Sequence, residues 1–547
     1  MKRIVAVFAD FAETFLGGRS HLQTEVGGAP LLSHTLRRAA RLGDAVDAIL
    51  LVVSPRDADI AAEFVRLGDH RDVAVAPIDK GDRPRRRLIR AGRIWGLESW
   101  RGTPLGTTYF DEFVHPPAVA AVLSHTDADA VLCVDGHQPL LGVDIARRML
   151  AHHAEQPDEA RFVFTQAPPG LAGVLLDRQV CAELCEQQWP LGLILSYRPE
   201  LPRTDPIMRP TCCRIDAAVA RTAARLTGDT VRSREILAGI FDALGAEAAA
   251  SSVCEHLRAG QVTRSGPLPV ELELELTTRD PLPNTTLRLR GERIPKREFS
   301  EIGGLARILR EFGGYDDRLV TLGGHGDPLL HPAFGDVCGA VRRAAILGLC
   351  VVTPLVELPD AALHALFDAP VDLVEIAIDA HTAETYRAVH GRDAFATVLS
   401  NIERIEAERR RRQSPQPILV PSLTRCAKTA ADLESFFDDW IRRTGTAVIR
   451  GYDDMQGRLA PDSLLSLTPP NRTACRQLAS RLVLLGDGRA TACSRDSHGD
   501  LAVGEWTNSP LSEIWQGREL QHLRDRHAAG RWGEIPACGA CRSWNGA

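Results

Sequence analysis

The sequence predicts an α/β protein in three segments, of which the middle one is a partial β/α barrel. Three observations carry this prediction: a length of 547 residues, short apolar runs that alternate with amphipathic stretches, and a change of texture near the C-terminus. One hydrophobic core rarely serves so long a chain, so two or three domains are expected. We place their boundaries at 1–265, 266–460 and 461–547.

The first segment alternates buried strands with helices. Continuous apolar runs such as RIVAVFA, VDAILLVV and DAVLCVD are typical of parallel strands that are covered on both faces. The stretches LLSHTLRRAARL and GVDIARRMLAHHA repeat apolar residues every three or four positions, which indicates helices. This segment is therefore expected to be a layered α/β domain.

The same alternation restarts in the second segment. Six apolar runs, from VELELEL to TAVIR, are separated by helical patterns such as EIGGLARILREF and DLESFFDDWIRR. Successive strand–helix units of this kind build parallel sheets with right-handed crossovers. We therefore expect an open (β/α)6 barrel, in which functional sites form at the carboxyl ends of the strands.

The third segment begins differently. SLTPPNRTAC has the composition of a linker, and RLVLLGDGRATAC that of a hairpin, in which Asp487-Gly488 suits a tight turn. Neither stretch repeats the strand–helix pattern that precedes it. A small, loop-rich segment with little apolar core of its own is expected here.

Four cysteines in this segment are candidate metal ligands. They are spaced C-x17-C-x44-C-x2-C, and the C-x2-C pair presents two sulfurs from one turn. Four thiolates suit a tetrahedral zinc site or the four corners of an iron–sulfur cluster, and the spacing alone leaves both open. The other nine cysteines lie in apolar or helical surroundings and are expected to be core thiols. The four candidates are Cys475, Cys493, Cys538 and Cys541.

The composition argues against several classes of function. A net charge of −6 and an aromatic content of 5% give no reason to expect that the protein binds nucleic acid. No stretch approaches about 18 uninterrupted apolar residues, so no membrane span is expected. The apolar run in the first ten residues, MKRIVAVFAD, is too short for a signal sequence. We therefore expect a cytoplasmic protein, in which disulfides are not expected. The sequence motifs of serine hydrolases and of helical zinc proteases are absent.

Several longer motifs resemble a known family. ELTTRD, TLGGHGDPLLHP and VEIAIDAHTAETYRAVHGRDAFATVLSNI, in this order on a partial barrel, resemble a radical S-adenosylmethionine (SAM) enzyme. CRQLASRLVLLGDGRATAC and ACGAC resemble its C-terminal companion, the SPASM domain, which binds auxiliary 4Fe–4S clusters. Together with a nucleotidyltransferase-like N-terminus, the whole chain resembles the spiro-SPASM proteins. The resemblance implies one 4Fe–4S cluster on the four late cysteines, since the full SPASM pattern has seven cysteines for two clusters.

The chain departs from the radical SAM pattern at the first barrel strand. In such enzymes this strand leads into C-x3-C-x2-C, whose thiolates hold a 4Fe–4S cluster on which SAM is cleaved. The corresponding residues here are Asp280, Asn284 and Leu287. Amides bind iron poorly and leucine cannot bind it. No cysteine lies between Cys254 and Cys338, so a shifted register does not restore the motif.

Other parts of the SAM site are kept, by the same resemblance. Gly324, Gly326 and Asp327 match the turn that receives the amine of SAM, where a carboxylate suits an ammonium group. Asp379 matches the strand end near the ribose. The alternative is that these glycines only form a strand-to-helix turn, so SAM binding is left open. The histidines on either side of the turn, at 325 and 331, are expected to be polar residues at its lip.

The N-terminal segment resembles nucleotidyltransferases with a nucleotide-diphospho-sugar fold. Gly17, Gly18 and Arg19 match the start of the loop that cradles phosphates through backbone amides. Asp135 in VLCVDGHQPLL matches the aspartate that holds Mg²⁺ on the nucleotide phosphates. The lysine that usually precedes the second glycine pair is absent. A retained fold without transferase activity is the alternative.

Three functional hypotheses follow. The first is an iron–sulfur protein of radical SAM and SPASM descent with an altered barrel, which binds a peptide, a nucleotide or a partner protein, or carries electrons. The second is a Mg²⁺-dependent nucleotidyltransferase that acts through the N-terminal segment. The third is a scaffold stabilised by zinc. The sequence leaves open whether the chain is an enzyme.

Overall fold

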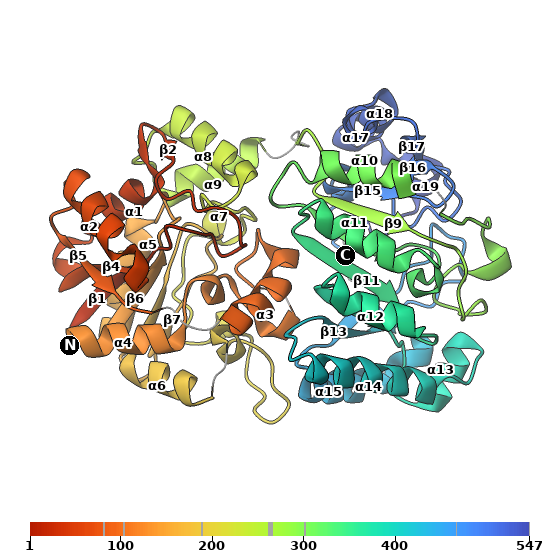
Figure 1. Cartoon of the computed structure of the whole chain (residues 1–547), viewed down its shortest axis with the longest axis horizontal. Helices are drawn as coiled ribbons and strands as arrows, with labels where there is room; N and C mark the ends of the chain where they lie inside the picture. The colour runs from red at the N-terminus through yellow and green to blue at the C-terminus, as the bar shows by residue number, and fades with distance from the viewer. Residues whose placement is uncertain are drawn as a thin grey trace. The chain divides into compact units, whose positions relative to one another are not determined.

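The computed structural model describes residues 1–79, 83–101, 104–187, 190–260, 266–299, 302–465 and 468–545. The chain divides into two compact units, Met1–Gln261 and Val262–Ala547. Each unit contains its own largely parallel sheet with helices between successive strands (Figure 1). The α/β class expected from the sequence is therefore confirmed. Of the expected linker SLTPPNRTAC, the first two residues lie outside the described part of the chain.

The first unit is built on a six-stranded sheet in the order β5-β4-β1-β6-β8-β7. The three strands predicted from their apolar runs, β1, β4 and β6, are parallel neighbours, as expected. Strands β8 and β7 add an antiparallel edge. The strands are β1 (Arg3–Phe8), β4 (Ala48–Val53), β5 (Val73–Pro77), β6 (Ala130–Asp135), β7 (Phe162–Val163) and β8 (Val174–Asp177), with a small hairpin of β2 (Glu25–Val26) and β3 (Ala29–Pro30).

Helices cover both faces of this sheet (Figure 1). Alternate residues of β1 point to opposite faces: Val5 and Val7 pack with α1, α5 and α8, whereas Ile4 and Ala6 pack with α4 and α6. The helices are α1 (Leu31–Ala40), α2 (Ala58–Leu67), α3 (Arg83–Arg93), α4 (Pro116–Thr126), α5 (Val143–Glu155), α6 (Arg178–Gln187), α7 (Ala217–Ala220), α8 (Val231–Leu244) and α9 (Ala250–Gly260).

The order of the strands fixes where a ligand is expected in this unit. From β1 the chain moves to β4 on one side, whereas β6 lies on the other side of β1 and leads toward β7 and β8. The loops after β1 and β6 therefore diverge above the carboxyl ends of two adjacent strands. Open α/β sheets bind ligands at such a switch point. Phe8 at the end of β1 pairs with Asp135 at the end of β6, which places Asp135 there.

The second unit contains one nine-stranded sheet in the order β14-β13-β12-β11-β10-β9-β15-β16-β17. Its first six strands are parallel and follow the order of the chain, which is the predicted open (β/α)6 arrangement. Strand β15 then pairs in parallel with β9, so the late segment continues the barrel sheet. The strands are β9 (Glu271–Glu275), β10 (Leu319–Gly323), β11 (Gly348–Thr353), β12 (Leu373–Ala377), β13 (Ile418–Arg425), β14 (Val448–Gly451), β15 (Arg481–Leu484), β16 (Arg489–Thr491) and β17 (Ala502–Glu505).

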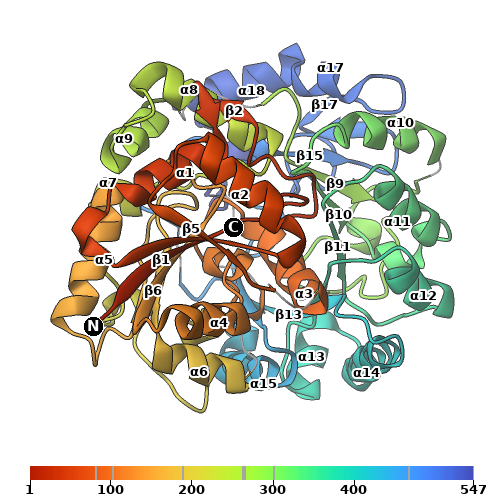
Figure 2. The same ribbon diagram turned by 60° about the vertical axis from the view of Figure 1, so that its left-hand side comes forward.

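The predicted turn at Asp487-Gly488 joins β15 to β16. Gly488 has a φ of 96°, a conformation that glycine adopts without strain. In Figure 2, α10, α11 and α12 lie along one side of the barrel strands. One apolar core joins these helices to the late segment, and it includes Leu482 and Trp515. The helices are α10 (Ile302–Phe312), α11 (Phe334–Arg343), α12 (Asp360–Asp368), α13 (Ala383–His390), α14 (Phe395–Arg411), α15 (Leu433–Thr444), α16 (Gln477–Ser480), α17 (Leu511–Trp515), α18 (Arg518–Ala528) and α19 (Pro536–Gly539).

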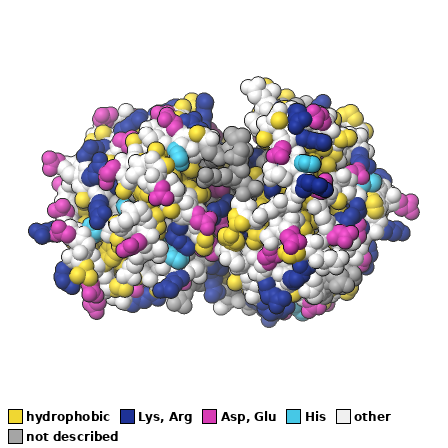
Figure 3. Space-filling model, turned by 90° about the horizontal axis from the view of Figure 1, so that it is seen from above, with side chains coloured by type: hydrophobic (Ala, Val, Ile, Leu, Met, Phe, Trp, Pro, Cys, Tyr) yellow, Lys and Arg dark blue, Asp and Glu magenta, His cyan; other side chains and the backbone are white. Residues whose placement is uncertain are grey.

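On the face shown in Figure 3, acidic and basic side chains of the described residues are interspersed. Among the described residues, no helix combines the length and the apolarity that crossing a membrane requires. The informative side chains are therefore those at the strand ends and among the late cysteines.

Candidate functional site

The four late cysteines lie on loops and short elements beyond the edge of the barrel sheet. Cys475 precedes α16, Cys493 follows β16, and Cys538 lies in the short helix α19, three residues before Cys541. All four are partly exposed free thiols. The backbone N–H of Cys541 donates to the carbonyl of Cys538 at 3.2 Å, which closes the C-x2-C turn. The turn predicted from the spacing is therefore present.

These thiols lie close enough together to affect one another's ionisation. Burial raises the pKa of Cys493 to about 12, and Cys475 and Cys541 add to the shift. Burial also raises the pKa of Cys538 to about 12, with the same two neighbours adding to it. The pKa of Cys541 is raised by burial too, and Cys475 contributes. The four thiols thus form one group, and metal binding must release their protons.

Cations and backbone amides surround this group. The backbone N–H of Arg495 donates to the Cys493 sulfur at 3.4 Å, and the Arg495 guanidinium pairs with Asp453. Arg472 holds the C-x2-C turn by donating to the carbonyl of Cys538 at 2.8 Å. Positive charge and N–H donors stabilise anionic thiolates and the clusters they bind. Sequence reasoning missed these residues, because nothing local connects arginines to distant cysteines.

The two kinds of metal centre differ in how far apart they hold their thiolates. A closed zinc site needs sulfurs about 3.8 Å apart, given tetrahedral bonds of about 2.3 Å. A 4Fe–4S cluster binds each cysteine to a different iron, so its thiolates stand farther apart. Among the described residues, no three His, Cys, Asp or Glu side chains are placed to share one metal ion.

Protein contacts fill the mouth of the barrel at two of the three positions that the resemblance compares with cluster cysteines. Asp280 accepts a hydrogen bond from the Nε of Arg290 at 2.8 Å, and both side chains are buried. Leu287 is buried in a small apolar cluster, whereas Asn284 is exposed. Protein groups therefore surround two of these three side chains. Sequence reasoning named Asp280, Asn284 and Leu287 but not Arg290.

A second buried ion pair stands beside the first. The Arg288 guanidinium donates to Asp379 at 2.6 Å, and the backbone N–H of Thr424 donates to the other oxygen of Asp379 at 2.7 Å. Burial alone would raise the pKa of Asp379, but Arg288 overrides it and the pKa is lowered. Asp379 lies two residues beyond the end of β12. Protein groups bind both of its carboxylate oxygens.

Asp327 is a buried acid for which the described part of the chain provides no ion pair. Its Oδ1 accepts a hydrogen bond from the backbone N–H of Leu329 at 3.1 Å, whereas Oδ2 has no hydrogen-bond partner among the described residues. Burial, together with the nearby Asp280, raises the pKa of Asp327 to about 8. Burial therefore favours the protonated, neutral form of this carboxyl group. Gly324 and Gly326 line the cavity beside it, and Gly326 lies so close to the backbone of Thr277 that no Cβ would fit.

The cavity at the barrel mouth is small. Its volume is about 30 Å³, which has room for about two water molecules. Arg288, Arg290 and Asp280 form part of its wall together with the two glycines. The sequence-predicted SAM residues are thus brought together, but around a space that the arginines have largely filled.

The two histidines that flank the glycine turn are not lip residues, contrary to expectation. His325 is buried and its Nδ1 lies 2.9 Å from Glu275, which also accepts two hydrogen bonds from Arg297. His331 is buried as well, with its Nε2 2.8 Å from a backbone carbonyl. Arg297 in turn donates to the carbonyl of Ser497 at 3.0 Å. These side chains connect the first barrel strand to the late segment, a structural role that a local pattern does not reveal.

In the first unit, the predicted phosphate loop is closed on itself. The N–H of Gly17 donates to the carbonyl of Thr14 at 3.0 Å, and that of Gly18 to the Thr14 hydroxyl at 3.2 Å. Arg90 donates to the carbonyl of Leu16 at 3.0 Å from outside the loop. Arg19 is exposed. The amides of the two glycines therefore bind protein oxygens in this conformation.

Asp135 ends β6 at the switch point, as predicted, and has a histidine as its partner. Its Oδ1 accepts from the backbone N–H of His137 at 3.1 Å and lies 3.3 Å from the Nδ1 of the same residue. The backbone N–H of Gly228 donates to the carbonyl of His137 at 3.0 Å. His137 is therefore held from two sides. Sequence reasoning named Asp135 and overlooked His137 in the same motif.

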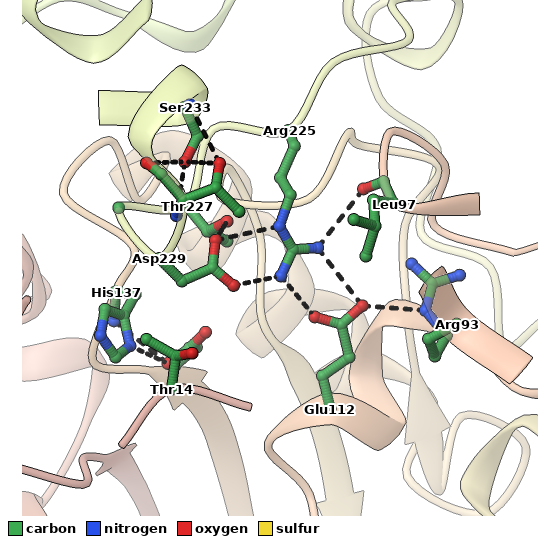
Figure 4. Close-up of polar contacts among 12 residues, drawn as sticks. Thr14, Arg93, Leu97, Glu112, His137, Arg225, Thr227, Asp229 and Ser233 are labelled. Carbon is green, nitrogen blue, oxygen red and sulfur yellow. Dashed lines mark hydrogen bonds and ion pairs between the residues drawn. The ribbon is translucent and has the colours of Figure 1, made fainter. Parts of the chain in front are cut away.

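A buried charge network lies beside this pair. Figure 4 shows Arg225 between Glu112 and Asp229, with His137 to one side. The guanidinium donates to Glu112 at 2.7 Å and pairs with Asp229, whose Oδ1 also accepts from the Thr227 hydroxyl at 2.6 Å. Burial opposes ionisation of Asp229, but Arg225 lowers its pKa to about 2. The network fixes the segment that reaches over the carboxyl end of β6.

Comparisons with known proteins identify one segment. Residues 475–542 match the model of the SPASM family, an iron-sulfur cluster-binding domain. An uncharacterized protein of Treponema pallidum (strain Nichols) is 24% identical over 246 residues, which are 43% of this chain and 67% of that relative. This relative carries no stated activity.

Among solved structures, SuiB of Streptococcus suis bound to its precursor peptide SuiA covers 63% of this chain and 80% of its own, with 10% identity and a TM-score of 0.40. BtrN in complex with AdoMet and 2-DOIA covers 50% and 93%, with 14% identity and a TM-score of 0.33. A cytidylyltransferase of Leptospira borgpetersenii serovar Hardjo-bovis (strain JB197) covers 48% and 95%, with 14% identity and a TM-score of 0.35. These likenesses are distant. Residues 475–542 of this chain are thus similar to an iron–sulfur cluster-binding domain of the SPASM type.

Proposed function

We propose that this chain is an iron–sulfur protein that holds one 4Fe–4S cluster in its late segment and does not cleave SAM in its barrel. The grouping of four thiols within a SPASM-type segment carries this proposal. The ligands would be Cys475, Cys493, Cys538 and Cys541. A bound cluster supplies one-electron redox chemistry, and the protein groups around it set its potential.

Two features favour a cluster over the zinc alternative. The four thiols lie in a segment that matches an iron-sulfur cluster-binding domain. Two arginines, Arg472 and Arg495, lie beside them, and Arg495 adds an N–H donor to a sulfur. Such groups offset the negative charge of a cluster with four thiolates.

The barrel mouth supports the loss of radical chemistry. Asp280 and Arg290 occupy each other at the position of the first lost cysteine. Leu287 contributes no metal ligand at the position of the third. The remaining cavity of about 30 Å³ has room for about two waters rather than a nucleoside. We infer that the barrel serves binding or electron transfer.

The inner face of the barrel sheet suits a polar ligand. Alternate residues of β9 place Leu272 and Leu274 in the core, so Glu271 and Glu273 lie on the opposite face. Arg481 pairs with both acids. A face lined by charges attracts a peptide, a nucleotide or a charged surface of a partner protein more than an apolar molecule.

Metal analysis tests this proposal directly. After anaerobic purification of the full chain, we expect about four irons and four sulfides per chain and a brown absorbance. One tightly held zinc without iron would instead support the scaffold hypothesis. Addition of SAM under reducing conditions should yield no 5′-deoxyadenosine.

A second function is favoured by one observation in the first unit. Asp135 stands at the switch point of an open α/β sheet, the position from which such sheets bind nucleotides. Nucleotidyl transfer would use Asp135 near a metal ion on the nucleotide phosphates. A thermal-shift screen of nucleoside triphosphates with Mg²⁺ tests this function, because a ligand of the native state raises its stability. The absence of any shift at millimolar concentrations would contradict it.

A further inference from the structure

The histidine beside Asp135 has one ring nitrogen without a partner. His137 is 5% exposed, and its Nε2 is buried without a hydrogen bond. Buried polar atoms in native proteins nearly always have partners, so an exception calls for an explanation such as a ligand. The rest of His137 is held firmly, by Asp135 through Nδ1 and the backbone N–H and by Gly228 through the carbonyl. The free nitrogen is therefore held in one place.

The contact with Asp135 fixes the tautomer of the ring. An ionised carboxylate only accepts hydrogen bonds, so the Nδ1 of His137 must carry the proton that it shares with Asp135. In the neutral ring this leaves the lone pair of Nε2 to accept a proton or to bind a metal ion. Carboxylate, histidine and metal ion form the arrangement in which a carboxylate orients a metal-binding imidazole.

The close approach of the chain at this point is built into the sequence. Between Asp135 and His137 stands Gly136, where a Cβ would lie 3.1 Å from the Cβ of Ala9 and 3.2 Å from a methyl of Leu22. A side chain at 136 would therefore push the turn away from the loop after β1. Packing around Gly136 therefore fixes the position of the turn that carries His137.

The charged side chains around His137 suit the binding of an anion together with a metal cation. Burial lowers the pKa of His21 to about 4, and Arg234, His137 and Arg19 add to the shift, so all three lie near His21. Arg19 and Arg234 are the cations of this neighbourhood, and Asp229 is its further acid. Because Arg225 and Thr227 already bind the oxygens of Asp229, that acid is a poor candidate ligand.

We propose that the switch-point site of the first unit binds a divalent transition-metal ion through the Nε2 of His137, together with a polyphosphate. Asp135 is then the residue that orients His137, in contrast to the direct Mg²⁺ ligand expected from the sequence. Imidazole suits Zn²⁺, Fe²⁺ or Ni²⁺ best, and Mn²⁺ accepts it more readily than Mg²⁺, which prefers oxygen ligands. Arg19 and Arg234 hold the phosphate oxygens, which complete the coordination of the metal ion.

Mn²⁺ with inorganic pyrophosphate is the probe that tests this site, because Mn²⁺ has little affinity for thiolates. Electron paramagnetic resonance of the full-length protein should show one bound Mn²⁺ per chain, with modulation from a coordinated ¹⁴N nucleus. A tenfold excess of Mg²⁺ should leave it bound. Displacement by that excess, the absence of the ¹⁴N signal, or no binding of Mn²⁺ would each overturn the proposal.

Two substitutions separate the role of the histidine from that of the aspartate. His137→Gln should abolish Mn²⁺ binding, whereas Asp135→Asn should weaken it by about 10- to 100-fold, as for other groups that orient a metal ligand. The opposite ranking would make Asp135 the ligand and overturn the proposal. His125→Gln, an exposed histidine on α4, is the matched control and should change nothing.

The outcome is independent of the cluster. Iron and sulfide contents should be the same in the wild-type chain and in the His137→Gln variant, and an unchanged thermal unfolding of the first unit shows that the variant is folded. A chain without iron would refute the proposed cluster and leave the Mn²⁺ result to be read on its own. A failed nucleotide screen would likewise leave the metal site standing, since the probe is pyrophosphate.

Discussion

The barrel mouth and the late cysteine group are two metal-site positions within one unit, and they differ in what fills them. At the mouth, Arg290 and Arg288 pair with Asp280 and Asp379 in a buried interior. Around the cysteines, the backbone N–H of Arg495 donates to the Cys493 sulfur, and the Arg472 guanidinium donates to the carbonyl of Cys538 in the C-x2-C turn. The first position is packed by protein groups, whereas the second keeps its thiols free.

This difference supports the proposal that the barrel has lost a cofactor. Under that proposal, a cluster that disappears leaves a polar, buried hole, and an unsatisfied buried charge costs several kcal/mol. Ion pairs between neighbouring loops can fill such a hole without changing the strands. The glycine turn and Asp327 then persist, because they also pack the barrel. The following experiments test whether the two positions differ in this way.

Removal of the paired thiols should have the largest effect. In a chain that carries Cys538→Ser and Cys541→Ser, hydroxyls replace two of the four thiolates and bind iron poorly. We expect iron to fall from about four per chain to below one. The melting temperature should fall as well, because metal binding contributes to folding free energy.

The matched control for this pair is Cys185→Ser, a partly exposed thiol in the first unit. It should keep the iron, the sulfide and the melting temperature of the wild-type protein. Undiminished iron in the double variant would show that other residues hold the metal.

The second largest effect is expected at the barrel mouth. Asp280→Ala leaves the buried Arg290 without its partner, and breaking one side of a buried ion pair costs about 3 kcal/mol or more. Urea denaturation should show this loss in the free energy of unfolding. Replacing both residues, with Arg290→Met added, should restore most of it. Asp393→Ala breaks an exposed ion pair and should cost less than about 1 kcal/mol.

A double variant that remains as unstable as Asp280→Ala would contradict this account of the mouth. It would mean that the arginine is needed for reasons other than charge balance. Iron content serves as a second measurement here and should be unchanged in every one of these variants.

The strands of both units could be predicted from the sequence because their signals are local. The run LVTLGG becomes β10 and DLVEIAI becomes β12, since buried parallel strands are continuously apolar. The turn at Asp487-Gly488 follows from the turn preference of two adjacent residues. The grouping of the four cysteines was likewise suggested by their types and by the C-x2-C spacing.

What could not be predicted depends on contacts between distant residues. Strand β15 joins β9 across about two hundred residues, and no periodicity encodes that pairing. Arg290 meets Asp280 only because a loop without regular structure returns to the strand end. The role of His137 depends on which ring nitrogen faces Asp135, which only a hydrogen bond reveals. The fold was therefore more predictable than its sites.

A pH effect sharpens the contrast at Asp327. Its pKa is raised to about 8 in the folded protein, against about 3.9 when unfolded, so the folded state holds one more proton between these values. The contribution of Asp327 to the free energy of unfolding is therefore fully present below about pH 4 and is lost as the pH rises to about 8. Relative to Asp327→Asn, the wild-type protein should lose up to about 1.4 kcal/mol per pH unit in this window.

Urea denaturation at several pH values measures this slope. Asp336→Asn, an exposed acid on α11, is the control and should show the pH dependence of the wild-type protein. Parallel pH profiles for the wild-type and Asp327→Asn proteins would show that Asp327 is ionised in the fold. In that case the mouth would carry one more negative charge than its two ion pairs balance.

The smallest effect is expected at the edge of the cysteine group. Arg495→Gln removes a positive charge beside Cys493 and Cys541 and leaves the backbone N–H that donates to the Cys493 sulfur. Reduction adds negative charge to a cluster, so loss of a nearby cation should lower the reduction potential, on the order of tens of millivolts. Redox titration followed by electron paramagnetic resonance measures the shift, with iron content unchanged. Arg518→Gln, exposed on α18, should leave the potential unaltered. An unchanged potential in Arg495→Gln would place the cluster away from Cys493, and the late cysteines would then no longer differ from the refilled mouth.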